Sequence, residues 1–294
     1  MATHAPAPVS TNAVIAVRGL VKRYGDLVAV DGIDFDVAPG EIFGLLGPNG
    51  AGKTTTVEIL EGYRTRDGGE VSVLGQDPAN AGLDWRQRIG VVLQSASLYQ
   101  NLTVTESLEL FAGYYEHPLE VERVVELVGL TEKRDSRARA LSGGQQRRLD
   151  LGLGLIGDPE VLFLDEPTTG FDPAARRAAW DVIRSLRTLG KTILLTTHYL
   201  DEAEQLSDRV AVLREGTIVA IGRPEELSGA APATEIRYRR NGQEVVVATH
   251  EPTRVLHELT AEALAQGQEL EGLSVRRPTL EEVYLALTTE EAPE

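Results

Sequence analysis

The stretch Leu45-Leu46-Gly47-Pro48-Asn49-Gly50-Ala51-Gly52-Lys53-Thr54-Thr55-Thr56 decides the fold of this chain. It fits the pattern G-x-x-x-x-G-K-[ST], in which a glycine-rich loop wraps around a phosphate. The apolar run at 41–46 predicts a buried strand, and 54–60 predicts a helix. A strand, a glycine loop and a helix start gather backbone N–H groups around an anion, and the helix dipole adds to the attraction. We therefore expect this loop to bind a nucleotide.

Within the loop we expect Lys53 to reach the β- and γ-phosphates and the Thr54 hydroxyl to bind Mg²⁺. The alternative is a chance match to the pattern, and the flanking strand and helix argue against it. The residues expected to contact the nucleotide are Gly47, Pro48, Asn49, Gly50, Ala51, Gly52, Lys53, Thr54 and Thr55.

Composition limits the class of protein. The 294 residues are 42% hydrophobic, enough for one large domain, or one large and one small, with a substantial core. Lysine and arginine total 29 against 45 acidic residues, a net charge of −16 that opposes binding to nucleic acid or anionic lipid. The chain has no cysteine, which excludes a disulfide framework and suits a reducing compartment.

Three segments are expected along the chain. Residues 1–13 lack a charged start and an apolar centre, so they predict a flexible leader and not a signal peptide. Residues 14–227 predict the main domain, and 228–294 predict a small accessory domain. The stretch Ser228-Gly229-Ala230-Ala231-Pro232 resembles a linker between them. No apolar run approaches the roughly 18 residues that would span a bilayer.

Strand-like and helix-like patterns alternate in the main domain, which predicts a mainly parallel α/β sheet. Beyond it, a hairpin turning at Asn241-Gly242 and two helices predict a small α+β domain, followed by a solvated tail at 290–294. The expected strands are 14–24, one starting at 34, 41–46, 69–74, 89–93, 161–164, 192–196, 210–213, 217–221, 235–240 and 244–248. The expected helices are 54–60, 103–115, 119–128, one starting at 142, 174–189, 253–265 and 280–287.

Leu164-Asp165-Glu166 follows an apolar run that is typical of a strand buried on both faces. Parallel strands direct their carboxyl ends to one crevice, so Asp165 is expected to bind the Mg²⁺. Glu166 is then placed to act on water as a general base. The alternative, a simple turn at the end of a strand, explains an Asp-Glu pair taken alone but not one that follows this strand and this loop.

Leu141-Ser142-Gly143-Gly144-Gln145 is the third motif. Ser142 is a good helix N-cap, and two glycines let a phosphate approach the helix that follows. Taken alone, Ser-Gly-Gly indicates only a capped helix. Upstream of the run that ends in Asp165-Glu166, however, the five residues resemble the signature of ATP-binding-cassette (ABC) ATPases.

That resemblance assigns further residues. Tyr24 is similar to the aromatic residue that stacks on adenine, although a strand aromatic within a core is the alternative. Gln94 resembles the glutamine that contacts Mg²⁺ and water and senses the transporter. Asp172 resembles the aspartate of the loop that crosses the dimer, and His198 the switch histidine at the γ-phosphate. Phe171 stands where leucine is usual, and its apolar character puts little in doubt.

The resemblance implies a fold and a reaction. The core is expected to add an antiparallel β subdomain and an α-helical signature subdomain, at about 95–157, to the parallel sheet. The implied cofactors are ATP and Mg²⁺. Two cassettes, as a homodimer or a heterodimer, would enclose ATP between Lys53 of one and the signature of the other, with Glu166 polarising the attacking water. The signature residues expected to act in trans are Ser142, Gly143, Gly144 and Gln145.

One cassette without a membrane span implies a separate integral membrane permease, bound through residues 94–141. The aromatics of Phe111-Ala-Gly-Tyr-Tyr115 either seat a helix of that permease or form the subdomain's own core. The stretch from Arg277 to Leu287 resembles the tail of ABC-2 drug-export cassettes of the daunorubicin-resistance subfamily. We therefore expect an ATPase on the cytoplasmic face of the cell membrane that powers export of a drug, lipid or polysaccharide.

Three alternatives remain open. An importer ATPase would share every motif except the tail. A soluble ABC ATPase of DNA repair would need a long coiled coil between Gln94 and Ser142, and one of translation would need two cassettes; the acidic charge also argues against nucleic acid. A non-hydrolysing regulatory module would be expected to lack Glu166 or the signature, and both are present.

Overall fold

A computed structural model describes residues 13–93, 99–230, 234–240 and 243–276. The chain divides into two compact units, one ending at Ile221 and one starting at Gly222. The sequence placed this boundary after Leu227, because the glycine and proline at 229–232 were the stronger local signal. Each unit is described by itself below.

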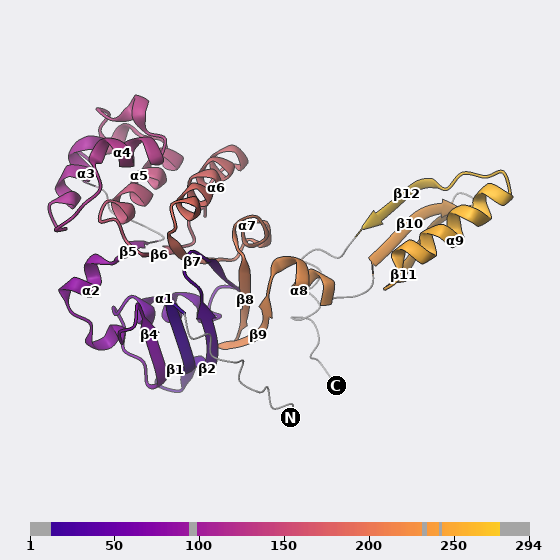
Figure 1. Ribbon diagram of the computed structural model, residues 1–294, viewed down its shortest axis with the longest axis horizontal. Helices are drawn as coiled ribbons and strands as arrows, with labels where there is room; N and C mark the ends of the chain where they lie inside the picture. Colours follow the sequence, from indigo (N-terminus) through magenta and orange to yellow (C-terminus); the bar gives the residue numbers. More distant parts are fainter. Residues whose placement is uncertain (1–12, 94–98, 231–233, 241–242, 277–294) are drawn as a thin grey trace. The chain divides into compact units, whose positions relative to one another are not determined.

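A parallel sheet forms the centre of the first unit (Figure 1). Its strand order is β5-β6-β7-β3-β8-β9, and β5 through β8 pair in parallel along that order. Every residue of the central strands β3, β6 and β7 is buried, as the sequence predicted for strands covered on both faces. The strands are β3 (Ile42–Leu46), β5 (Ile89–Val92), β6 (Val161–Asp165), β7 (Thr192–Thr197), β8 (Arg209–Arg214) and β9 (Thr217–Gly222).

Parallel pairing fixes where the motifs lie. Leu46 is in register with Thr197, and Asp165 with Thr196, so three strands end at one edge of the sheet. The glycine loop, Glu166 and His198 follow those ends directly. Between β8 and β9, Glu215 and Gly216 both have positive φ, which is typical of a tight turn joining two strands.

An antiparallel sheet of order β2-β1-β4 forms the second layer of this unit. Ile15 lies opposite Val37 on one side and Val73 on the other. The expectation that a strand starts at Asp34 is wrong, because β2 begins at Leu27 directly after the Tyr24–Leu27 turn and only ends at Val37. Pairing along β1 outweighs the weak local pattern of residues 27–33. The strands are β1 (Ile15–Tyr24), β2 (Leu27–Val37) and β4 (Gly68–Val73).

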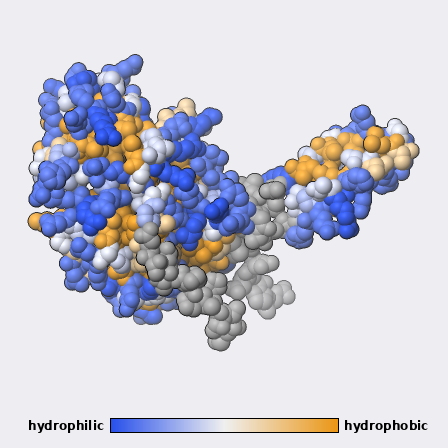
Figure 2. Space-filling model, viewed as in Figure 1, coloured by the Kyte–Doolittle hydropathy of each residue, from blue (hydrophilic) through white to orange (hydrophobic). Residues whose placement is uncertain are grey.

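Helices α3, α4 and α5 gather in a subdomain of their own (Figure 1). Apolar side chains of all three, including Leu108, Val124 and Leu149, share a buried cluster with β6 and β7. Figure 2 shows a mostly hydrophilic face, with apolar residues over this subdomain. The helices of the unit are α1 (Lys53–Leu60), α2 (Leu83–Gln87), α3 (Val104–Ala112), α4 (Val121–Leu127), α5 (Gly143–Leu155), α6 (Pro173–Thr188) and α7 (Leu200–Leu206), with 3-10 turns at Pro78–Asn80, Thr131–Lys133 and Ala138–Ala140.

The sequence analysis missed two of these helices. In α2, Trp85 is 1% exposed, and its indole N–H donates to the carbonyl oxygen of Val73 at 2.9 Å. In α7, Glu202, Ala203 and Leu206 are buried. Both helices are too short to show the periodicity that identifies a helix in a sequence, and tertiary packing holds them.

The second unit is a three-stranded antiparallel sheet, of order β11-β10-β12, with one long helix. Ile236 and Tyr238 of β10 are buried, and every residue of β12 is exposed. The linker expected from Ser228 is wrong in its first part, because α8 continues to Ala230. The expected helix at 280–287 and the tail at 290–294 lie outside the described residues. The elements are α8 (Pro224–Ala230), β10 (Thr234–Arg240), β11 (Gln243–Thr249), α9 (Pro252–Ala265) and β12 (Glu271–Arg276).

Within the described ranges, no helix combines the length and the apolar character needed to cross a bilayer.

Candidate functional site

The glycine loop runs from the end of β3 to the start of α1. A Cβ atom at Gly47 would lie 2.5 Å from the carbonyl oxygen of Leu213, and one at Gly52 would lie 2.4 Å from that of Ala29. Gly52 also has a φ of 101°, which side chains rarely adopt. Both glycines are therefore required by the packing behind the loop. Pro48, Asn49 and Gly50, at its crest, are exposed.

Lys53 is the first residue of α1 and is only 5% exposed. Its ammonium donates to the carbonyl oxygens of Gly47 at 2.8 Å and Pro48 at 3.1 Å. Burial lowers the pKa of Lys53, while Glu166 and Asp165 oppose that shift. A desolvated cation held over the loop is placed to attract a phosphate oxygen strongly, because little water screens it.

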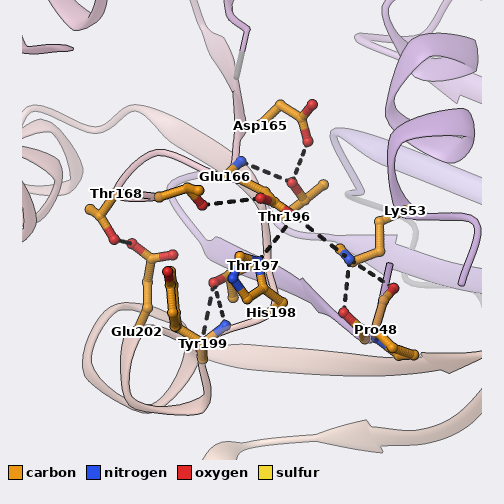
Figure 3. Close-up of polar contacts among 12 residues, drawn as sticks. Pro48, Lys53, Asp165, Glu166, Thr168, Thr196, Thr197, His198, Tyr199 and Glu202 are labelled. Atoms are coloured by element: carbon orange, nitrogen blue, oxygen red, sulfur yellow. Dashed lines mark hydrogen bonds and ion pairs between the residues drawn. The ribbon is translucent and has the colours of Figure 1, made fainter. Parts of the chain in front are cut away.

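Asp165 ends β6 and is 9% exposed. The Thr196 hydroxyl, on β7, donates to its Oδ1 at 2.5 Å and fixes the carboxylate (Figure 3). Thr54, whose hydroxyl the sequence assigned to the metal, is exposed at the start of α1. A carboxylate and a hydroxyl are hard oxygen donors that suit Mg²⁺, and Mg²⁺ sites of this kind use few protein ligands with the phosphates. No cluster of three or more His, Asp or Glu side chains able to bind a metal occurs among the described residues.

Glu166 is the meeting point of the site (Figure 3). Its Oε1 lies 3.2 Å from Nδ1 of His198 and 3.9 Å from the Lys53 ammonium. Its Oε2 accepts a hydrogen bond from the Thr169 hydroxyl at 3.0 Å. The approach of His198 lacks hydrogen-bond geometry, so it acts as an ion pair only when the imidazole is protonated. A carboxylate that is 10% exposed beside two potential cations can accept a proton from a water molecule held there.

The backbone of Glu166 is unusual. Its φ is 45°, a left-handed conformation that costs a non-glycine residue roughly 1–3 kcal/mol. The backbone N–H of Glu166 donates to the Thr196 hydroxyl at 3.0 Å and to the Thr196 carbonyl at 3.2 Å. These bonds hold the strained turn and direct the Glu166 side chain toward the lysine.

The signature motif caps α5. The Ser142 hydroxyl accepts from the backbone N–H of Gln145 at 3.3 Å, and the Gln145 side chain accepts from the Ser142 backbone N–H at 2.9 Å. Gly143 has no neighbour within 4 Å of where a Cβ would stand, and both Ser142 and Gly143 are exposed. Within the described ranges, the Ser142 and Gln145 side chains bond inside this cap and not to the glycine loop of the same chain.

The other assigned residues occupy separate places. Tyr24 ends β1, is 39% exposed and has the Lys22 ammonium 5.5 Å and the Arg64 guanidinium 5.3 Å from its ring centre. An exposed aromatic ring is available for stacking, whereas the core alternative would need it buried. Asp172 is the N-cap of α6 and accepts from the backbone N–H groups of Ala174 and Ala175. Gln94 lies outside the described residues.

Sequence reasoning missed a second layer of polar residues. Thr196 is fully buried, and its hydroxyl bonds to the Asp165 carboxylate and to the backbone N–H of Glu166. In the sequence, nothing distinguishes it from the other residues of its strand. Behind it, Glu202 accepts from the Thr168 hydroxyl at 2.6 Å and from the Trp180 indole at 3.1 Å. Burial raises the pKa of Glu202, and these hydrogen bonds oppose the rise. A glutamate that follows the histidine by four positions was the available signal.

The fold and the loop define a P-loop nucleoside triphosphatase. Residues 30–169 match the family model described as "ABC transporter". The chain is 39% identical over 301 residues to daunorubicin resistance ATP-binding protein DrrA3 of Streptomyces coeruleorubidus, covering 93% of this chain and 95% of that protein. It is 45% identical over 228 residues to Nod factor export ATP-binding protein I of Ralstonia nicotianae, covering 76% and 71%. Among solved structures, cbiO1 of Clostridium perfringens, part of the ABC transporter complex cbiONQ, has a TM-score of 0.68 at 27% identity, covering 74% of this chain and 90% of that one.

The chain belongs to the ATP-binding proteins of ABC transporters. It is the ATP-hydrolysing, nucleotide-binding subunit of such a transporter, as the sequence predicted.

Proposed function

We propose that this ATPase powers export through a separate membrane permease, and that Glu166 is the general base of its reaction. The observation that carries the catalytic assignment is the position of Glu166 Oε1, 3.2 Å from His198 Nδ1 and 3.9 Å from the Lys53 ammonium. Lys53 would hold the β- and γ-phosphates, and His198 would contact the γ-phosphate. Glu166 would then accept the proton of the water that attacks phosphorus.

Mg²⁺ fits the oxygen donors of Thr54 and Asp165, with Gln94 assigned by resemblance as a third ligand. When bound, the ion would neutralise charge that develops on the phosphates. The chain's own contribution is orientation. Thr196 holds the Asp165 carboxylate through one oxygen and leaves the other for a ligand. The Tyr24 ring would stack on adenine and set the position of the base.

We further propose that the working unit is a dimer of cassettes, either two copies of this chain or one copy with a second cassette. The exposed start of the signature helix supports this, because Ser142 and Gly143 are exposed and nothing lies within 4 Å of where a Cβ of Gly143 would stand. A γ-phosphate at this helix start in the partner copy would be stabilised by the helix dipole. Asp172, at the neighbouring start of α6, would lie at the same interface.

The first unit also carries a groove that suits a segment of a permease. Its volume is about 660 Å³, and it lies where α1, β5, α3 and α5 meet. Tyr63 is 80% exposed and Leu93 is 52% exposed, so large apolar side chains are available for contact. Phe111 and Tyr115 line the groove and also pack on the helical core, so both roles considered for this aromatic stretch fit them. A helix of a membrane subunit is the occupant we propose, which would place the ATPase on the cytoplasmic face of the membrane.

Export is supported by the names of the relatives, whereas the ABC-2 type is proposed from the resemblance of the sequence at 277–287 to ABC-2 export cassettes. The protein from S. coeruleorubidus is named for daunorubicin resistance and the one from R. nicotianae for export of Nod factor. The first of these matches nearly the whole chain, including the accessory domain. A drug, a lipid or a polysaccharide is the class of substrate that we propose.

Glu166→Gln tests the catalytic assignment. The variant should bind ATP with affinity within about twofold of wild type, because the amide keeps the shape of the site, and lose roughly 10²-fold or more in ATP turnover. It should also form an ATP-dependent dimer on sizing chromatography. Glu109→Gln, an exposed change on α3, is the matched control. Undiminished turnover by Glu166→Gln would refute the general-base role, and a monomer in saturating ATP would refute the dimer.

A further inference from the structure

Arg147 is a buried arginine that none of the motifs requires. It lies on α5, one turn beyond the signature cap, and is 6% exposed. Burial lowers the pKa of Arg147, and Asp150, Asp165 and Glu202 oppose that shift. A guanidinium remains charged in such a place, and its planar fork carries five N–H donors. Burying that charge is costly unless the donors are satisfied.

The donors of Arg147 are directed at the loop that carries the two site carboxylates. Its Nη2 donates to the carbonyl oxygen of Asp165 at 2.8 Å and to that of Glu166 at 3.4 Å. Its Nε donates to the carbonyl oxygen of Pro167 at 3.0 Å. Three consecutive peptide groups of one loop are thus bonded to a single side chain of the signature helix.

A fourth bond leads to the groove. Nη1 of Arg147 donates to the carbonyl oxygen of Leu93, directly after β5. Leu93 lines the groove, and its side chain is 52% exposed. One guanidinium therefore joins the groove, the signature helix and the turn at Glu166.

Arg147 also acts where the backbone is strained. The Glu166 turn, with its φ of 45°, is held by Thr196 on the side of the sheet and by Arg147 on the side of the helical subdomain. Such a conformation persists only when its surroundings enforce it. Loss of the Arg147 guanidinium would remove its hydrogen bonds from this turn, and we expect the Glu166 carboxylate to change position as a result.

We propose that Arg147 is a positioning residue that fixes the Glu166 turn and couples it to Leu93, so that the groove and the catalytic carboxylate change together. This rests on the proposed roles of Glu166 and the groove. Arg148 provides the comparison within the chain. It follows Arg147 on the same helix, but its guanidinium donates to the carbonyl oxygens of Gly129 and Val128, inside the helical subdomain.

The first test compares Arg147→Met, Arg147→Lys and Arg148→Met in the full-length chain. For Arg147→Met we expect kcat for ATP, per molecule able to bind ATP, to fall about 10- to 100-fold, with KM within about threefold, because position and not binding is lost. Arg147→Lys should recover part of kcat, since lysine keeps the charge but not the fork. Arg148→Met should retain kcat within about twofold. An unchanged kcat per binding-competent molecule in Arg147→Met would overturn the positioning role, and counting bound ATP separates this from simple loss of folded protein.

The second test reads the groove directly. Because the chain has no cysteine, Leu93→Cys provides a single attachment point for an environment-sensitive fluorophore. In a Glu166→Gln background, ATP should shift the emission of this label, and Arg147→Met should abolish the shift while ATP still binds. Arg148→Met should preserve it. The coupling would be overturned if the ATP-dependent emission shift persisted in Arg147→Met. It would also be overturned if the labelled protein that retains Arg147 bound ATP without any emission shift. Neither emission result depends on whether Glu166 is the general base. ATP turnover by Glu166→Gln tests that role separately.

Discussion

The hydroxyl of Thr196 donates to Asp165 Oδ1 at 2.5 Å, across two adjacent parallel strands. The same hydroxyl accepts from the backbone N–H of Glu166 at 3.0 Å. One buried threonine thus orients Asp165, the proposed Mg²⁺ ligand, and supports the turn that carries Glu166, the proposed general base. Both contacts follow from the register in which Asp165 lies opposite Thr196.

Replacing this threonine should weaken metal-dependent turnover. In Thr196→Val the hydroxyl is lost at nearly constant volume, so the Asp165 carboxylate loses its fixed orientation. We expect ATPase activity at limiting Mg²⁺ to fall about tenfold and the unfolding free energy to fall by about 1–3 kcal/mol. The measurement is a Mg²⁺ titration of ATPase activity.

Thr192→Val is the matched control for that prediction. Thr192 lies on the same strand and is 3% exposed, and its hydroxyl accepts from the backbone N–H of Gly40 at 3.0 Å. Its loss should cost similar stability and leave the Mg²⁺ dependence of turnover unchanged. Equal Mg²⁺ dependence in the two variants would show that Thr196 has no special role at the metal.

Lys53→Ala should lose nucleotide binding. The desolvated ammonium over the glycine loop supplies a charge-assisted contact to phosphate, and we expect ATP affinity to fall at least about 100-fold, near 3 kcal/mol. Titration calorimetry measures this. Lys191→Ala, which removes an ion pair with Asp158 away from the loop, should bind ATP as wild type does. Affinity within threefold of wild type in Lys53→Ala would contradict the role given to this lysine.

Glu61 should make the protein less stable in alkaline solution. Burial, with smaller contributions from Asp165 and Glu58, raises the pKa of Glu61 to about 8 in the folded protein from 4.5. Between these values the folded state holds a proton that the unfolded state has released. The unfolding free energy therefore decreases as pH rises from about 4.5 to about 8, and the penalty is constant above that.

Glu61→Gln removes this ionisation. At pH 9, without Mg²⁺ or nucleotide, the variant should be more stable than wild type by about 1–3 kcal/mol, allowing for the partial exposure of the side chain. The difference should vanish near pH 5. Melting temperatures across this range measure it, with Glu109→Gln as a change of the same kind at an exposed site. A constant difference between wild type and Glu61→Gln at every pH would rule out this titration.

Asp172 should have a structural role that is separable from the proposed one at the dimer. Asp172→Ala loses the cap of α6, which we expect to lower the unfolding free energy by about 1 kcal/mol. Asp172→Asn keeps an oxygen acceptor and should retain that stability. If the charge also acts across the dimer, Asp172→Asn should still reduce ATP-dependent dimerisation. Full dimerisation by a stable Asp172→Asn would confine the residue to its cap.

The sequence predicted the central sheet well, because each strand there is an apolar run bounded by glycine or a polar turn. It also placed Gly47, Asp165 and His198 at one edge, since parallel strands leave no other arrangement for them. It could not find α2 or α7, which are helices of five and seven residues held by Trp85 and Leu206 in the core. A short helix of this kind has too few residues for its pattern to show.

The residues that support the motif residues of the site were harder to predict from the sequence. Thr196 acts on residues 30 or more positions away in the sequence. Arg147 acts through backbone carbonyl oxygens. Backbone carbonyls leave no mark in the sequence, so an arginine that binds four of them resembles a solvated helix residue. Likewise, the strain at Glu166 depends on its surroundings and not on residue type.

The crowding behind Gly47 and Gly52 bears on how such chains evolve. The atoms that exclude a side chain there belong to Leu213 and Ala29, on two different sheets, and not to a ligand. Selection for folding alone would therefore retain both glycines. A descendant that had lost its ATPase activity would keep both glycines long after Lys53 and Glu166 had been substituted. The glycines of the motif therefore indicate common ancestry, whereas the lysine and the glutamate indicate retained activity.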